Sequence, residues 1–228
     1  MASPRLAPKI VVLALAASLA LLAGCGDDEP KGDLPPGDQL LKDSAAAMRE
    51  VSTARFVITS EAVIADVPVR GAEGQLTREG NAKGSVRIDQ AGSIVEFNFE
   101  IIGDKLWLKG PTGGYQELPL ALAANVYDPS VILNPDRGVA RLLSTATGAK
   151  TEARDGDSYR VAAKFDASAV SALVPGAGEG VTGKVWVHAD TKLPQKTTFT
   201  IPAAGGGKPG QVTVEFKEYN APVTINAP

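Results

Sequence analysis

Apolar and polar residues alternate along much of the chain, and the alternation is clearest over residues 94–102. Within this segment the odd-numbered positions carry Val95, Phe97, Phe99 and Ile101, and the positions between them carry Glu or Asn. Successive side chains of a strand point to opposite faces of its sheet. The segment therefore predicts a strand with one dry and one wet face, which is typical of an antiparallel sheet with a solvated side.

The same period of two recurs before and after this segment, between residues that favour turns. Asp155-Gly156 is a dipeptide typical of hairpins, whereas Pro68 and Gly71 interrupt the pattern. The alternation predicts about nine or ten strands. They cover residues 56–65, 74–79, 83–90, 94–102, 105–109, 150–154, 158–165, 181–189, 195–202 and 212–217.

Helices are predicted at the start of the chain and in its middle. Residues 38–52 have the apolar spacing of an amphipathic helix, with Asp38 as its N-cap. Asp136 and Asp166 are expected to cap helices over 137–145 and up to 174, and Asp128-Pro129 reads as a further helix start. Residues 118–126 are apolar and Ala-rich without clean alternation.

The order of these elements contains no βαβ series. It predicts an α+β fold in which helices lie against one face of a strongly curved antiparallel sheet, because a sheet this wide tends to curl. A curled sheet covered by helices encloses a volume. The apolar inner face is then either an ordinary filled core or the lining of a cavity.

The first 24 residues have the organisation of an export signal. Arg5 and Lys9 precede an apolar run over 10–22, which is too short for a membrane span of ~20 residues. The run ends at Leu22-Ala23-Gly24-Cys25, the lipobox pattern of bacterial lipoproteins, in which cleavage leaves an acylated cysteine as the new N-terminus. An ordinary signal peptide followed by a free thiol is the alternative. We expect a signal peptide over 1–24, a lipidated Cys25 with a flexible tether over 25–37, and a single domain over 38–228.

The composition of the chain excludes some classes of function. Arg5 and Lys9 leave with the signal, so the formal charge of −3 becomes −5 in the mature chain, which argues against nucleic acid as a partner. No cysteine remains for a disulfide, so stability must come from packing. Hydrophobic residues make up 44% of the chain but aromatic residues only 5%, so few bulky side chains are available to fill a wide space.

The sequence holds no recognisable catalytic site. His188 is the sole histidine, and alternation places it on the outer face of its strand, beside Trp186. A transition-metal set would lack a second histidine, and no Gly-x-Ser-x-Gly elbow is present. We therefore expect no enzyme, no catalytic residue, no metal and no cofactor. The short Ala-rich helices and the anchor at a membrane favour a cavity for an apolar ligand over a filled core.

Several motifs occur together in a specific order. They are Ile101-Ile102-Gly103-Asp104-Lys105-Leu106-Trp107-Leu108, Tyr127-Asp128-Pro129, the run from Ile132 to Ala140, Lys150 with Glu152 and Arg154-Asp155, and Lys184-Val185-Trp186-Val187. In this order and spacing the chain resembles the LppX/LprA/LprF/LprG lipoproteins of mycobacteria and other actinobacteria, over nearly the whole mature chain.

That resemblance implies a half-barrel antiparallel sheet with helices on its concave face, similar to the carriers LolA and LolB, enclosing an apolar cavity for acylated lipids or glycolipids. Phe97 stands where glycolipid-binding members carry a smaller residue, and its ring is expected to narrow the pocket. The implied cavity lining is Val86, Ile88, Val95, Phe97, Phe99, Ile101, Leu106 and Leu108. The implied mouth or lid is Tyr127, Ile132, Leu133, Val139, Leu142 and Leu143.

These inferences lead to one functional hypothesis and one alternative. The hypothesis is a lipoprotein anchored through Cys25 to the extracytoplasmic face of the cell membrane, which carries acylated lipids or glycolipids across the envelope and has an envelope transporter as a candidate partner. The alternative is a structural or adaptor lipoprotein with a filled core and no lipid cargo.

Overall fold

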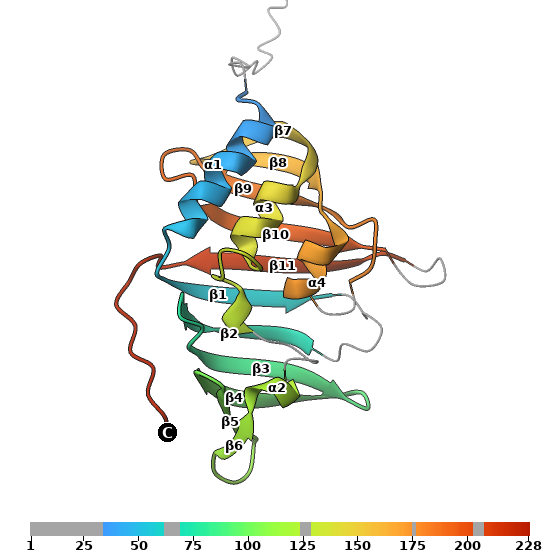
Figure 1. The fold of residues 1–228 in the computed structure, drawn as a ribbon. Coiled ribbons are helices and arrows are strands. Elements are labelled where there is room, and N and C mark those ends of the chain that lie inside the picture. Colours follow the sequence, from blue (N-terminus) through green and yellow to red (C-terminus); the bar gives the residue numbers. More distant parts are fainter. Residues whose placement is uncertain (1–33, 62–68, 124–128, 175–176, 203–207) are drawn as a thin grey trace, which may run out of the picture. The chain divides into compact units, whose positions relative to one another are not determined.

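An antiparallel sheet of eleven strands forms the frame of the computed structural model (Figure 1). The structure describes residues 34–61, 69–123, 129–174, 177–202 and 208–228, and residues 33–228 form one compact unit. The strands are β1 (Thr53–Ser60), β2 (Val69–Thr77), β3 (Ala82–Gln90), β4 (Ser93–Ile102), β5 (Lys105–Lys109), β6 (Gln116–Pro119), β7 (Thr147–Asp155), β8 (Ser158–Lys164), β9 (Thr182–His188), β10 (Pro194–Ile201) and β11 (Gly210–Lys217).

The strand order is β6-β5-β4-β3-β2-β1-β11-β10-β9-β8-β7. Nearly every strand pairs with the strand next to it in sequence, but β1 also pairs with β11, so the first and last strands meet in the middle of the sheet. In that pair Phe56 lies opposite Phe216. The antiparallel α+β class predicted from the sequence is thus confirmed.

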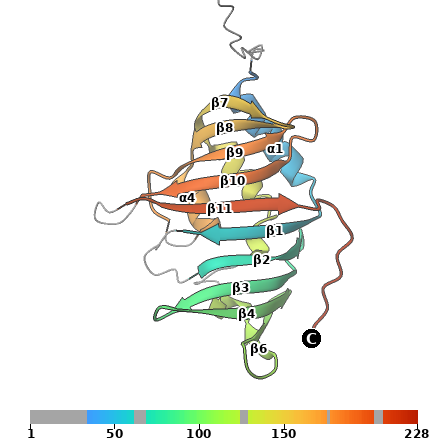
Figure 2. The ribbon, with the colours of Figure 1, turned by 180° about the vertical axis from the view of Figure 1, so that it is seen from behind.

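The helices lie against one face of this sheet. They are α1 (Gly37–Arg49), α2 (Leu120–Ala123), α3 (Val139–Thr145), α4 (Ala167–Leu173) and a 3-10 turn η1 (Pro129–Val131). Figure 1 looks onto the helices, and Figure 2 looks onto the sheet from behind. The apolar side of α1 is buried through Leu40, Leu41, Ala45 and Met48, as its amphipathic pattern predicted.

Two of the three predicted helix caps are wrong. Helix α1 begins one residue before Asp38, at Gly37, where a Cβ would lie 2.8 Å from the backbone of Ala149. Helix α3 begins after Gly138 rather than after Asp136, because a turn precedes it in which the N–H groups of Gly138 and Val139 donate to the Asn134 and Ile132 carbonyl oxygens at 2.8 and 3.0 Å. The third cap is confirmed, since the Asp166 carboxylate accepts the Ala169 N–H at 3.1 Å.

The predicted strands need three corrections. Gly71 does not interrupt the sheet but lies within β2, which extends from Val69 to Thr77. Of the apolar stretch 118–126, residues 118–123 belong to the end of strand β6 and to the short helix α2, and residues 124–126 lie outside the described residues. Residues 62–65 of the first predicted strand lie outside the described residues, and β1 ends at Ser60. Among the described residues, every helix is too short or too polar to cross a membrane.

Candidate functional site

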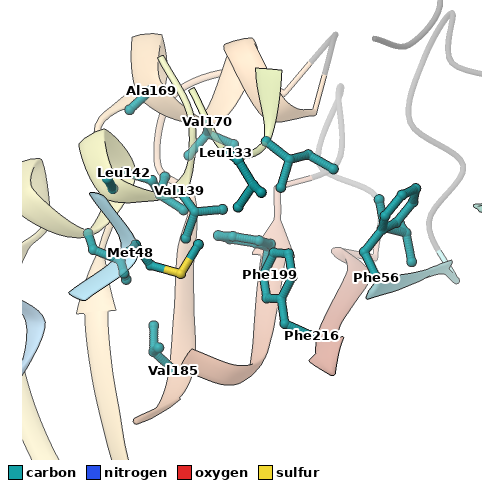
Figure 3. Packing of buried hydrophobic residues seen from close by; sticks show 14 of the residues in the cluster. Met48, Phe56, Leu133, Val139, Leu142, Ala169, Val170, Val185, Phe199 and Phe216 are labelled. Carbon is teal, nitrogen blue, oxygen red and sulfur yellow. The ribbon is translucent and has the colours of Figure 1, made fainter. Parts of the chain in front are cut away.

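The first of two apolar pockets lies between the middle of the sheet and helices α3 and α4. Its volume is about 60 Å³. Figure 3 shows Val139 of α3 pointing into the same region as the rings of Phe199 and Phe216 from the sheet. Its lining is apolar apart from Ser60 and Thr197, and consists of Ile58, Ser60, Val69, Ile132, Val139, Leu142, Leu173, Val174, Thr197, Phe199, Val212, Val214 and Phe216.

The second pocket lies over strands β2 to β6 and is larger, at about 260 Å³. An apolar cavity of about 150 Å³ already binds benzene, so this space is large enough for part of an alkyl chain. Leu122 of α2 is 67% exposed and belongs to its rim. All the lining side chains are apolar: Val69, Val86, Ile88, Phe99, Ile101, Leu106, Leu108, Leu118, Leu120, Leu122 and Pro129.

Val69 of β2 belongs to the lining of both pockets. It lies opposite Ile88 in the β2–β3 ladder, so the two spaces adjoin at the start of β2 on the helix-covered face. The helix-covered face therefore holds two neighbouring apolar spaces.

A pair of glycines lies beside Phe99, a lining residue of the second pocket. Gly74 of β2 lies opposite Gly84 of β3, and Phe56 and Phe99 lie opposite them on the outer sides of this strand pair. A Cβ at Gly84 would lie 2.0 Å from the Glu73 carbonyl oxygen, and a Cβ at Gly74 would lie 2.2 Å from that of Lys83. Because no side chain fits at either position, the strands approach closely there, and such glycines often mark a bend in a sheet.

Most of the residues predicted to line a cavity come together in the second pocket. Val95 and Phe97 do not line it. They lie half-buried nearer the start of β4, and a Cβ at Gly110 would lie 3.4 Å from the Phe97 ring. The predicted residues that do line it are Val86, Ile88, Phe99, Ile101, Leu106 and Leu108.

The residues predicted for a mouth or lid divide between pocket and core. Ile132, Val139 and Leu142 line the first pocket, whereas Leu133 and Leu143 are buried in the surrounding core. Tyr127 lies outside the described residues, as does Cys25.

The sequence reasoning did not identify the sheet side of the first pocket. Ile58 comes from β1, Phe199 from β10, and Val212, Val214 and Phe216 from β11. Alternation did mark these strands, but only the pairing of β1 with β11 brings their apolar faces together. The rim residues Leu118, Leu120 and Leu122 were missed because their stretch lacks a clear period.

No reactive centre accompanies the pockets. His188 is half-buried, and its Nδ1 accepts the backbone N–H groups of Asp190 and Thr191 at 3.2 and 3.3 Å, which closes a turn. Within the described ranges, His, Cys, Asp and Glu side chains form no group of three that could hold a metal. The arrangement supplies apolar contact and exclusion of water, which suits binding rather than bond making.

The fold and its pockets define a class of protein, an α+β domain with apolar pockets between a sheet and its helices. The model of the LppX_LprAFG lipoprotein family matches residues 36–225. The chain belongs to this family, which confirms the resemblance found in the sequence and, with it, the expectation of a non-enzymatic protein.

A relative agrees with this assignment, and two solved structures share the fold. The lipoarabinomannan carrier protein LprG of Mycobacterium leprae is 28% identical over 228 residues, with 96% of this chain and 94% of that protein covered. The crystal structure of LprF from Mycobacterium bovis is 22% identical, with a TM-score of 0.72 over 84% of this chain and 96% of that one. LppX from Mycobacterium tuberculosis is 19% identical, with a TM-score of 0.59 over 83% and 97%.

Proposed function

We propose that this protein binds acylated lipids or glycolipids in an apolar cavity made of the two adjoining pockets, and carries them across the cell envelope. The observation that carries the proposal is the second pocket, with about 260 Å³ bounded by apolar side chains alone and adjoining the first at Val69. Membership of the lipoprotein family supports it, as does the carrier activity in the name of the LprG relative.

The cavity follows from a strongly curved, half-barrel sheet with its helices on the concave face. A sheet of eleven strands tends to curl, and the close approach at Gly74 and Gly84 supports a sharp bend beside the larger pocket. The segment from Tyr127 to Leu143 forms the mouth or lid. The rim residue Leu122 provides an apolar surface over which alkyl chains enter.

Binding is driven by removal of alkyl chains from water. Each methylene transferred into the cavity contributes about 0.8 kcal/mol, and ordering a flexible chain offsets part of this gain. No covalent step is involved. A carrier must also release its cargo, so a site that relies on non-directional apolar contact is well suited to repeated loading and unloading.

The anchor is the second part of the proposal. Residues 1–24 act as a signal peptide, Cys25 is acylated at the extracytoplasmic face of the cell membrane, and the residues after it tether a single domain. The predicted tether over 25–37 ends earlier than expected, because Pro35 accepts a hydrogen bond from Thr151 and Gly37 begins α1. An envelope transporter is a candidate partner. The rival, a structural or adaptor lipoprotein, requires that the same face be a filled core and that no lipid be bound.

Mass spectrometry of bound lipid tests the proposal. The chain without its signal and with Cys25→Ala is expressed in an actinobacterial host, purified and extracted with organic solvent. Removing the acylated cysteine ensures that any acyl chains in the extract come from cargo. A stoichiometric acylated species is expected. An empty extract from a folded protein, together with no binding when lipid is offered, overturns the carrier function and favours the adaptor.

A further inference from the structure

The outer face of the sheet, opposite the helices, carries a second kind of surface over β7 to β11. Figure 2 looks onto this face. A shallow groove of about 630 Å³ lies there. We call it the basic groove, and its lining is Gly148, Lys150, Arg160, Ala162, Ala163, Lys164, Thr182, Gly183, Lys184, Trp186, Lys196, Thr198, Thr200, Gln211 and Thr213.

Strand register arranges the polar side chains of the groove in rows. One row runs from Lys150 through Ala162 and Lys184 to Thr198 and Thr213. The rows on either side hold Arg160, Trp186 and Lys196, and Lys164, Thr182 and Thr200. Cationic groups and hydroxyl donors therefore cover one continuous patch of sheet.

The groove is positive although the whole chain has a formal charge of −3. Glu152 pairs with Arg160 at 3.3 Å and with Lys184 at 2.8 Å, and Asp155 pairs with Arg160 at 2.9 Å. These two carboxylates leave three of the five cations in excess. A third carboxylate, Glu215, lies opposite Lys196 but pairs with Lys217 at 3.3 Å. Within the described part of the chain, Lys150 and Lys164 form no ion pair, and both are exposed.

Trp186 adds an amphipathic group to the same surface. Its Nε1 donates to Asp155 at 2.8 Å, and the Lys196 ammonium lies 5.3 Å from its ring centroid. Tryptophan is enriched at the headgroup level of membranes, because one end of its ring is apolar and the other polar. Cations, hydroxyls and an indole together match a layer of phosphate headgroups.

The chain enters the folded unit beside this groove. The Thr151 hydroxyl donates to the Pro35 carbonyl oxygen at 2.6 Å, and Gly37 packs against the backbone of Ala149 and Lys150. Pro35 lies ten positions after Cys25, and a flexible segment of that length would have a root-mean-square span of about 16–19 Å. A membrane anchor at Cys25 would therefore hold the β7 edge near the bilayer surface.

We propose that the basic groove docks onto anionic phospholipid headgroups of the membrane to which the protein is anchored. The inference rests on the anchor in the proposed function. The tether keeps this edge close to the bilayer, and the excess cations then hold the outer face of β7 to β10 against its negative surface. Docking fixes the orientation of the domain. The outer face of the sheet then lies against the bilayer, and the helix-covered face with its pockets points away from it.

Vesicle sedimentation tests the docking surface. The mature chain with Cys25→Ala is mixed with vesicles of phosphatidylcholine alone or with about 30% phosphatidylglycerol, so that the anchor makes no contribution. Binding is expected only to the anionic vesicles and should weaken with added salt, because the attraction is screened. Neutralising one lysine near an anionic surface weakens binding about fivefold, and two about 25-fold.

Matched variants show whether vesicle binding depends on the basic groove. Lys150→Gln with Lys164→Gln should show the 25-fold loss, whereas Lys42→Gln with Lys109→Gln, which changes the net charge equally, should show little. Glu152→Gln should strengthen binding about fivefold, because it removes a carboxylate from the groove. Equal losses in the two double variants, or equal binding to neutral and anionic vesicles, overturn the proposal.

Two further readouts separate this inference from the carrier function. Binding of a fluorescent acyl probe without vesicles should be the same in the groove variants and the parent chain. If the lipid extract is empty but vesicle binding still depends on the groove, the carrier function is wrong and the docking surface is supported. If the groove binds soluble polyglutamate but not vesicles, docking onto a membrane is wrong, and the groove instead binds an acidic protein.

Discussion

Val86→Trp separates a cavity from a filled core. Val86 is half-buried, lines the second pocket, and lies opposite the small residue Ala72 of β2 and opposite Phe97 of β4. A tryptophan there would extend its ring over Ala72 into the pocket. The pocket, at about 260 Å³, has room for the ring without displacing neighbouring side chains.

The magnitude follows from the space that the ring takes from an alkyl chain. Tryptophan has about seven more side-chain atoms than valine, and if half of them occupy the chain's position, three or four methylenes are excluded. At about 0.8 kcal/mol per methylene, the loss is about 2.4–3.2 kcal/mol, which weakens binding roughly 50- to 200-fold. In a filled core, the same substitution instead lowers stability by about 1–3 kcal/mol through overpacking.

Binding of a fluorescent acyl probe, together with urea unfolding, measures both quantities. Ser85→Trp is the matched control, because it adds the same ring one residue away on the opposite face of β3, beside Glu73 and Asn98. We expect Val86→Trp to keep its unfolding midpoint and lose probe affinity, and Ser85→Trp to keep both. A destabilised Val86→Trp with unchanged affinity would refute the cavity.

The remaining predictions concern stability. Gly84→Ala should lower the free energy of unfolding by at least about 3 kcal/mol, because its Cβ would lie 2.0 Å from a carbonyl oxygen, whereas Gly178→Ala, with open space around it, should change the urea midpoint little. Ser44→Ala should raise that free energy by about 1 kcal/mol, since the Ser44 hydroxyl is buried without a partner among the described residues; a lower midpoint would contradict this. Hydrogen bonding from Lys184 lowers the pKa of Glu152 below 4.5, so its contribution is present above that pH and lost as the pH falls below it. Glu152→Gln should therefore flatten the acid limb of a stability profile measured from pH 7 to 3, and an unchanged limb would refute this.

Alternation predicted the strands well because it is a local property of the chain. The apolar residues of β4 face one way whatever lies beside them, and Phe99 and Ile101 are buried as expected. The register across strands depends instead on distant residues. The pairing of Phe56 with Phe216, more than 150 residues apart, assembles the first pocket, and no local period contains that information.

Helix starts and glycines were less predictable for a related reason. Helix α1 begins at Gly37, where the backbone of Ala149 comes too close for a Cβ, and α3 begins directly after Gly138, where the Ile132 carbonyl oxygen does the same. Gly71 looked like a strand breaker, but it lies in β2 where the Arg87 guanidinium covers it. In each case tertiary packing, rather than local propensity, determines the residue.

Photolabelling of the binding site tests the central claim most directly. A phospholipid with a diazirine near the end of one acyl chain is loaded into the protein, activated by light, and located residue by residue by mass spectrometry. We predict labels on Val86, Ile88, Leu106 or Leu108, which line the second pocket. Labels confined to the alternate residues Ser85, Arg87 and Trp107, or none at all, would contradict an alkyl chain held between the sheet and its helices.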